Sequence, residues 1–183
     1  MTRTLAVFLL VIPIAAPVAA QQTLTSPVRE QLFSEIRGLS PREIAELREG
    51  RGMGLARAAE LNGYPGPRHV LEAVEAGQLH LSPEQLQAVR RLFDVMSGEA
   101  RRLGDAILRE EQALEGAFRA GTIGEGDLRT RVARIAALQS ELRVLHLKTH
   151  LEARVLLSEH QVQRYNQLRG YGGGGADPGR HGH

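Results

Sequence analysis

Three residue types are absent or nearly absent from this sequence, and each absence excludes a class of protein. The chain of 183 residues has no cysteine and no tryptophan, and Lys148 is its single lysine. Without cysteine there is no disulfide scaffold, no thiolate metal ligand and no cysteine nucleophile. The formal net charge is only +2, and the chain has just three tyrosines and four phenylalanines. Because a nucleic-acid binder needs a basic stripe and stacking rings, we expect no nucleic-acid partner.

Strand signals are also scarce, and helix signals take their place. The β-branched and aromatic residues are few and do not alternate along the chain. The residues that dominate are Ala, Leu, Glu, Arg and Gln, which lose little side-chain freedom in a helix. The sequence therefore predicts an all-α protein.

The one long apolar run lies at the N-terminus. Arg3 precedes it, and Val18-Ala19-Ala20 fits the small-x-small pattern that favours cleavage. We predict a cleaved signal peptide over residues 1–20 and export across the inner membrane, with an uncleaved N-terminal anchor as the alternative. No later apolar run is long enough to span a membrane.

Two long helices are predicted in the second half of the chain. Heptad spacing from residue 89 onward predicts an amphipathic helix over 83–118. A glycine-rich break at 120–127 ends it, and we expect Asp127 to be the N-cap of a second helix that reaches residue 156. A short turn between two long helices predicts an antiparallel hairpin. The apolar row of the first helix consists of Val89, Phe93, Met96, Ala100, Leu103, Ile107 and Leu114.

Shorter helices are predicted on the N-terminal side of the hairpin. Segments 26–38 and 40–50 each begin with Ser-Pro and end with Gly, which favour the two ends of a helix. Further short helices are predicted over 54–63 and 68–77.

The mature chain therefore divides into three parts. Residues 21–67 form the short helices and a turn, residues 68–169 form the hairpin domain, and residues 170–183 form a flexible Gly/His tail. Two helices leave part of each apolar seam uncovered, so we expect a dimer of hairpins to complete the burial.

A short phrase recurs at the start of three predicted helices. It reads LSPEQ at 81–85, LSEHQ at 157–161 and LSPRE at 39–43. Each copy places a serine three residues before a Gln or Glu, which is the spacing of a capping box, and the leading leucine acts as a hydrophobic staple. Each box marks a helix start and stabilises it by roughly 1 kcal/mol.

Two of these copies bracket the hairpin, and this arrangement resembles the LTxxQ motif pair of the Spy/CpxP family of periplasmic proteins. Tyr165, four residues after the second Gln, is also similar to the family pattern. The resemblance covers 68–169 and the signal peptide, and it covers 26–67 poorly. The motif residues are Leu81, Ser82 and Gln85 in one copy and Leu157, Ser158 and Gln161 in the other, with Ser in place of Thr.

The resemblance implies a periplasmic, all-helical, dimeric protein that acts in envelope stress. Some members of the family are ATP-independent chaperones that hold unfolding clients. Others restrain a sensor kinase, and ZraP-like and CnrX-like members respond to metals. We therefore expect a holding chaperone for unfolded envelope proteins, with a sensor kinase as a further partner. The motif residues are expected to be structural, and no catalytic role is carried over.

Histidines indicate an alternative function in metal sensing or buffering. His146 and His150 lie four residues apart on the second long helix, so they share a face on which one zinc, nickel or copper ion can be held. His160 lies near the next helix start, and His181 and His183 end the tail as further candidate ligands. The other interpretation is two half-exposed helix histidines at the edge of the seam and a polar tail. The chaperone function itself requires no cofactor.

No group of residues predicts catalysis. The segment GRGMG at 50–54 has glycines like those of a phosphate loop, but it follows a charged helix and lacks Lys-Ser/Thr. We interpret it as a helix break. No Ser-His-acid set or close carboxylate pair is fixed by spacing, so we expect a binding protein rather than an enzyme.

Overall fold

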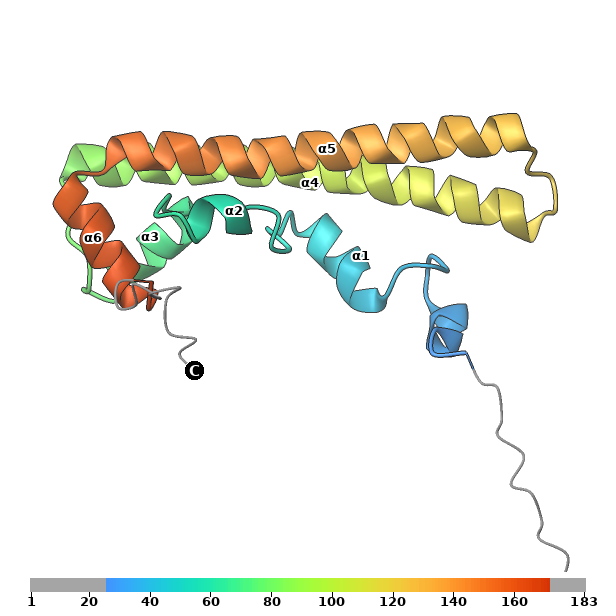
Figure 1. The fold of residues 1–183 in the computed structure, drawn as a ribbon, viewed down its shortest axis with the longest axis horizontal. Coiled ribbons are helices and arrows are strands. Elements are labelled where there is room, and N and C mark those ends of the chain that lie inside the picture. The colour runs from blue at the N-terminus through green and yellow to red at the C-terminus, as the bar shows by residue number, and fades with distance from the viewer. Residues whose placement is uncertain (1–25, 172–183) are drawn as a thin grey trace, which may run out of the picture.

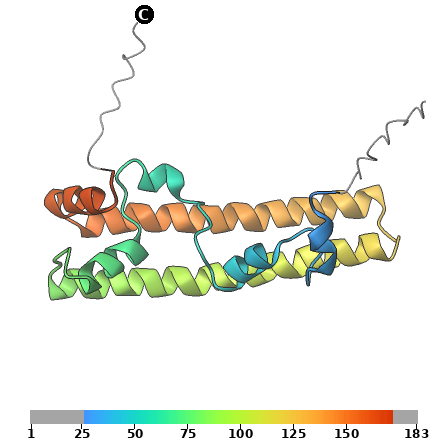
Figure 2. The same cartoon turned by 90° about the horizontal axis from the view of Figure 1, so that it is seen from below.

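The computed structural model describes residues 26–171, and every regular element in that range is a helix, which confirms the all-α prediction. The two long helices run side by side as an antiparallel hairpin, and the shorter elements lie along one side of it (Figure 1, Figure 2). The predicted signal peptide and the tail histidines His181 and His183 lie outside the described residues. The elements in chain order are η1 (Arg29–Phe33), α1 (Pro41–Arg48), α2 (Arg57–Glu60), α3 (Pro67–Glu75), α4 (Pro83–Arg119), α5 (Glu125–Leu156) and α6 (Glu159–Leu168).

The hairpin follows the heptad pattern of the sequence. An apolar row with this spacing stays on one face of a helix, so each long helix buries one stripe. Gly121 has a left-handed backbone with φ of 65° and ends α4, as expected of a glycine after a helix. The buried members of the α4 row are Val89, Met96, Ala100, Leu103 and Ile107.

The start of α5 differs from the prediction. Asp127 lies inside the helix, and the N-cap is Gly124, which offers no side-chain hydrogen bond. Asp127 instead pairs with Arg131 one turn later, with 2.9 Å between Oδ2 and Nε. The helix begins earlier because Glu125 and Asp127 both place negative charge in its first turn, where the helix dipole favours it.

The predicted helix over residues 26–38 is wrong. Only Arg29–Phe33 is helical, as a 3-10 element whose N-cap is Val28 rather than Ser26. Leu32 and Phe33 are exposed, so no buried apolar stripe stabilises a longer helix here.

The other short helices form where they are expected but are shorter. The clearest case is α2, which keeps only Arg57–Glu60 of the predicted segment 54–63. Met53 and Gly54 both have left-handed backbones, with φ of 43° and 75°, and this geometry cannot belong to a right-handed helix.

The short elements and the hairpin share one apolar core. Ile44 and Leu47 of α1 pack with Leu103 and Ile107 of α4 in this core. The closest approach lies at Gly104, where a Cβ would stand 2.0 Å from the carbonyl oxygen of Leu47. Gly104 therefore allows α1 to reach the backbone of α4, because any larger residue would hold the two apart.

A second core closes the open end of the hairpin. It joins α3 and α6 to the beginning of α4 and the end of α5. Within the described range, no helix has both the length and the apolar character needed to cross a membrane. The buried members of this core are Val70, Leu79, Val89, Leu157, Val162 and Tyr165.

Candidate functional site

The two motif copies lie against each other at the open end of the hairpin. Both form complete capping boxes: Gln85 N donates to Ser82 Oγ at 3.2 Å, and Gln161 N donates to Ser158 Oγ at 3.3 Å. The two glutamine side chains also meet, and each Nε2 lies within 3.0 Å of the other's Oε1.

Each motif glutamine also binds the backbone next to the other motif. Gln85 Nε2 donates to the carbonyl of Leu156 at 2.9 Å, and Gln161 Nε2 donates to the carbonyl of His80 at 3.0 Å. The glutamines therefore cap their own helices and tie the ends of α4 and α5 together. In both motifs the leading leucine, Leu81 or Leu157, belongs to or packs against the core at this end. These contacts are structural, with no arrangement that resembles a catalytic site.

Tyr165 anchors α6 in the same region. Its side chain is fully buried, and its hydroxyl accepts a hydrogen bond from Gly66 N at 3.4 Å. Burial raises the pKa of Tyr165 to about 12, so the hydroxyl stays neutral. The third family-like residue is therefore also structural, and it fixes the turn that precedes α3.

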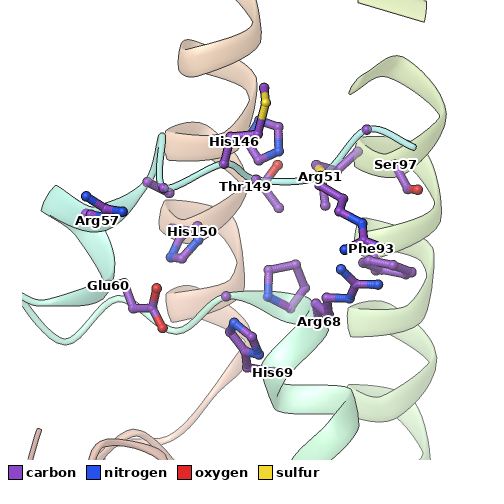
Figure 3. A pocket seen from close by; sticks show the side chains of 18 of the residues that line it. Arg51, Arg57, Glu60, Arg68, His69, Phe93, Ser97, His146, Thr149 and His150 are labelled. Atoms are coloured by element: carbon purple, nitrogen blue, oxygen red, sulfur yellow. The ribbon is translucent and has the colours of Figure 1, made fainter. Parts of the chain in front are cut away.

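A cavity of about 260 Å³ lies between the middle of the hairpin and the short elements. His146, Thr149 and His150 face it from α5, and Phe93 and Ser97 face it from α4 (Figure 3). The loop after α1, the segment of α2 and the start of α3 form the remaining walls. This cavity is the candidate functional site, because it brings both predicted histidines together with residues from four other segments.

His146 is buried and has a free ring nitrogen. Only 5% of the residue is exposed, and Nδ1 lies 2.9 Å from the carbonyl oxygen of Leu142. A carbonyl only accepts hydrogen bonds, so Nδ1 carries the proton and Nε2 carries the lone pair. Nε2 is buried and has no hydrogen-bond partner. Burial is the main cause that lowers the pKa of His146, and the neighbouring His150 adds to it, so the ring is neutral near pH 7.

His150 has the same arrangement through a different partner. The residue is 9% exposed, and its Nδ1 lies 2.7 Å from the carbonyl oxygen of Tyr64. Because a carbonyl only accepts hydrogen bonds, Nδ1 is the donor in this contact. A Cβ on Gly66 would stand 3.1 Å from Nε2 of His150, so glycine at this position keeps space next to the ring.

The interpretation of these two histidines as half-exposed residues at the seam's edge is wrong. Both are buried because the turn at 61–67 and the loop at 50–54 cover this face of α5. Helix periodicity alone placed them at the edge, since the covering segments are distant in the sequence. His160 is exposed in the first turn of α6 and does not line the cavity. Among residues 26–171, no three His, Cys, Asp or Glu side chains form a group able to hold a metal ion.

Several residues of this cavity are not predicted by the sequence. The segment 50–54 is a helix break as expected, but it also forms a wall, together with Met53. Met96, expected only in the apolar seam, lines the cavity as well. Met53 lies between two glycines, and it also packs against the apolar core that α1 shares with the hairpin.

Most of the charge at the cavity is already paired. Arg51 Nε lies 2.5 Å from Glu49 Oε2, and Arg169 Nη2 lies 2.8 Å from Glu60 Oε1. Burial works to raise the pKa of Glu60, but hydrogen bonds from Tyr171 and Arg169 hold it below its usual range. Neither lining carboxylate is therefore a free ligand.

Comparison with known proteins gives only a partial similarity. No family model matches the chain, and no solved structure matches it. Over 81 residues it is 36% identical to adenylyl-sulfate kinase from Escherichia coli (strain K12 / DH10B) and from Shigella boydii, which is 43% of this chain and 40% of each kinase. The chain spans about two fifths of the length of the curated relatives it matches.

This partial match does not bring a phosphate site with it. A P-loop needs a strand, a Gly-rich turn ending in Lys-Ser/Thr, and a helix. The part of the chain that the structure describes has no strand, and segment 50–54 follows helix α1. The match therefore carries no argument for phosphoryl transfer by the described residues.

Proposed function

We propose that the protein is a periplasmic, ATP-independent holding chaperone that binds unfolded envelope proteins during stress. The observation that carries the proposal is an apolar surface on the side of the hairpin that the short elements leave free. The resemblance of the bracketing motif pair to the Spy/CpxP family agrees with it. No enzymatic step is part of the proposal.

The position of this surface follows from helix geometry. Gly104 faces α1, and Val95 lies nine residues before it, so the two point about 180° apart at 100° per residue. On α5, Val155 lies nine residues after His146, which faces the cavity, so it also points to the free side. Val95 is 71% exposed and Val155 is 85% exposed. Val144 and Leu151 lie on the same side of α5, and both are exposed.

Two shallow grooves on this surface lie between α4 and α5. One is lined by Leu92, Val155 and neighbouring residues, and the other by Leu103, Val144 and their neighbours. Arg91, Glu99, Glu141 and Glu152 stand at the edges of these grooves. Exposed apolar side chains beside charges of both signs give a surface that binds unfolded segments weakly and without strict sequence preference. We name this surface, defined by Val95, Val144, Leu151 and Val155, the free face.

An aggregation assay tests the proposal. Purified chain in several-fold molar excess is expected to suppress light scattering by a chemically denatured model enzyme without nucleotide. The double variant Val144→Glu/Val155→Glu is expected to need at least about fivefold more protein for the same suppression, because two buried charges oppose client binding. Absence of suppression by the unmodified chain contradicts the function.

Leu61→Glu is the matched control. Leu61 is exposed like the free-face residues but lies at the end of α2, on the covered side of the hairpin. Its replacement is expected to leave suppression unchanged. If it weakens suppression as much as the double variant does, the free face is not the binding surface.

The free face is also where a second copy of the chain is expected to pack. Sedimentation of the unmodified chain and of the double variant separates client binding from dimer formation on this face. Loss of suppression with the dimer intact identifies the free face as the client surface, and loss of both means that the free face also forms the dimer contact. The resemblance also implies a sensor kinase as partner, which co-purification from envelope extracts would test.

A second candidate function is metal binding in the cavity. The observation that favours it is the pair of buried imidazoles, each with Nδ1 against a backbone carbonyl, together with the buried Nε2 of His146 that has no hydrogen-bond partner. Metal-binding histidines commonly show this arrangement, in which the second ring nitrogen donates to a carbonyl and orients the ligand. Titration of the chain with metal ions, with and without His146→Gln, tests it.

A further inference from the structure

Both methionines of the mature chain line the same cavity as both buried histidines. The chain has three methionines, and Met1 falls in the predicted signal peptide, so Met53 and Met96 are the remaining two. Met53 comes from the loop after α1 and Met96 from α4, and both line the cavity with His146 and His150. The loop after α1, α4 and α5 thus line one cavity with two methionines and two histidines.

The backbone of Met53 gives a second, independent observation. Met53 is the only non-glycine residue among residues 26–171 with a positive φ, at 43°. A left-handed conformation is unfavourable for a residue that carries a side chain, so such residues concentrate at sites where function requires them. Glycines at 52 and 54 make the loop permissive, yet the strained position carries a methionine.

The ligand set favours a soft cation of low charge. Imidazole and thioether groups are neutral, and thioethers prefer copper(I) and similar ions over magnesium, calcium or zinc. The carboxylates that line the cavity, Glu49 and Glu60, are held by arginines. Arg57 and Arg68 also line it. A buried dication without free carboxylate or thiolate ligands is unfavourable, and a monovalent ion costs less to bury.

We propose that the cavity binds one copper(I) or silver(I) ion through His146, His150, Met53 and Met96. The inference rests on the second candidate function, metal binding, and narrows it to a soft monovalent cation. It adds the two methionines as ligands and leaves out His160 and the tail. Binding needs no change of oxidation state, because the ion enters as copper(I) or silver(I).

The test uses the chain purified from the periplasm with His181→Gln and His183→Gln as background. Silver(I), and copper(I) under anaerobic conditions, are titrated against a chromophoric competitor, with zinc and nickel in parallel. One silver(I) or copper(I) per chain is expected. Met53→Leu, Met96→Leu and His146→Gln are each expected to weaken binding at least about tenfold, since each removes one ligand atom.

Matched controls separate ligand loss from unfolding. Leucine has nearly the volume of methionine, so the Met→Leu variants are expected to keep the circular dichroism spectrum and melting behaviour of the background. His160→Gln removes an exposed histidine outside the cavity and is expected to leave binding unchanged.

The remaining outcomes contradict the soft-cation inference alone or together with metal binding in this cavity. Zinc or nickel binding that depends on His146 and is insensitive to both Met→Leu changes overturns the soft-cation inference and leaves metal binding in place. Binding that the unmodified chain shows and the His181→Gln/His183→Gln background lacks contradicts both the soft-cation inference and metal binding in this cavity. Absence of binding to the background chain does the same.

Discussion

At the scale of single residues, the buried ring of His146 links pH to stability. Burial lowers its pKa in the folded chain below the ordinary value of 6.5, which the unfolded chain retains. Below pH 6.5 the unfolded state therefore binds more protons, and the free energy of unfolding falls as the pH drops from 6.5 towards the folded pKa. Above pH 6.5 the contribution of His146 is constant.

We expect the melting temperature to fall between pH 7 and pH 5, with a smaller fall in His146→Gln. The neighbouring His150 adds to the lowering of the pKa of His146. The charged and titratable groups that line the same cavity from other elements are Glu49, Arg51, Arg57, Glu60, Arg68 and His69. Burial raises the pKa of Glu111, so its protonation stabilises the folded chain as the pH falls and opposes the effect of His146. Comparison with His146→Gln isolates the contribution of His146, because Glu111 is present in both proteins. Equal pH dependence in both proteins would contradict the prediction.

Two glycines of α4 allow the same substitution with opposite expected results. Gly104→Ala places a Cβ against the Leu47 carbonyl, and forced overpacking of this kind costs about 1–3 kcal/mol. Gly98→Ala meets nothing within 4 Å on the same helix, and alanine stabilises a helix over glycine by about 0.5–1 kcal/mol. Urea denaturation of the two variants checks both signs. A stabilised Gly104→Ala would mean that α1 does not pack there.

At the scale of elements, the two motif glutamines couple the ends of α4 and α5. Gln85→Ala is expected to lower the free energy of unfolding by about 1–3 kcal/mol, because it leaves the part-buried carbonyl of Leu156 unpaired. Gln161→Ala is expected to cost less, because its contact with the His80 carbonyl is exposed and water can replace it. The double variant is expected to lose at least about 0.5 kcal/mol less than the sum, since the residues share a hydrogen bond.

The capping box of α1 provides the control for this coupling. Glu43 accepts hydrogen bonds from Ser40 N and Oγ only, within its own box. Glu43→Ala is expected to cost at most about 1 kcal/mol, the worth of a local cap. The effects of Glu43→Ala and Gln85→Ala on the free energy of unfolding are also expected to be additive. Full additivity of the two glutamine variants would show that the boxes act separately.

The elements also show which sequence signals were sufficient. Heptad spacing, capping boxes and glycine breaks located α4, α5 and α6 closely, because long amphipathic patterns and caps act locally. The prediction failed for residues 26–38, where Ser-Pro and Gly are present but no partner buries Leu32 and Phe33. Short helices depend on tertiary packing for their stability, and a local pattern cannot supply it.

At the scale of the whole molecule, the free face and the cavity lie on opposite sides of the hairpin. Substitutions on one side are therefore expected to leave the activity of the other side unchanged. Val144→Glu/Val155→Glu should leave silver(I) affinity unchanged, and Met53→Leu should leave suppression of aggregation unchanged. Titration and light scattering on the same protein preparations check this. A change in both activities from either variant would mean that the two sides are coupled.

The sequence by itself determined the helical class, the hairpin and the capped helix starts, because these depend on periodicity and on contacts between residues three or four apart. It also brought forward His146 and His150, since their spacing places them on one face. Their burial, the unpartnered Nε2 of His146 and the presence of Met53 and Met96 in the same cavity were decided by the tertiary structure alone. These features arise where the loop after α1 and the turn before α3 fold back onto α5, and contacts across about 90 residues of chain leave no local pattern to detect.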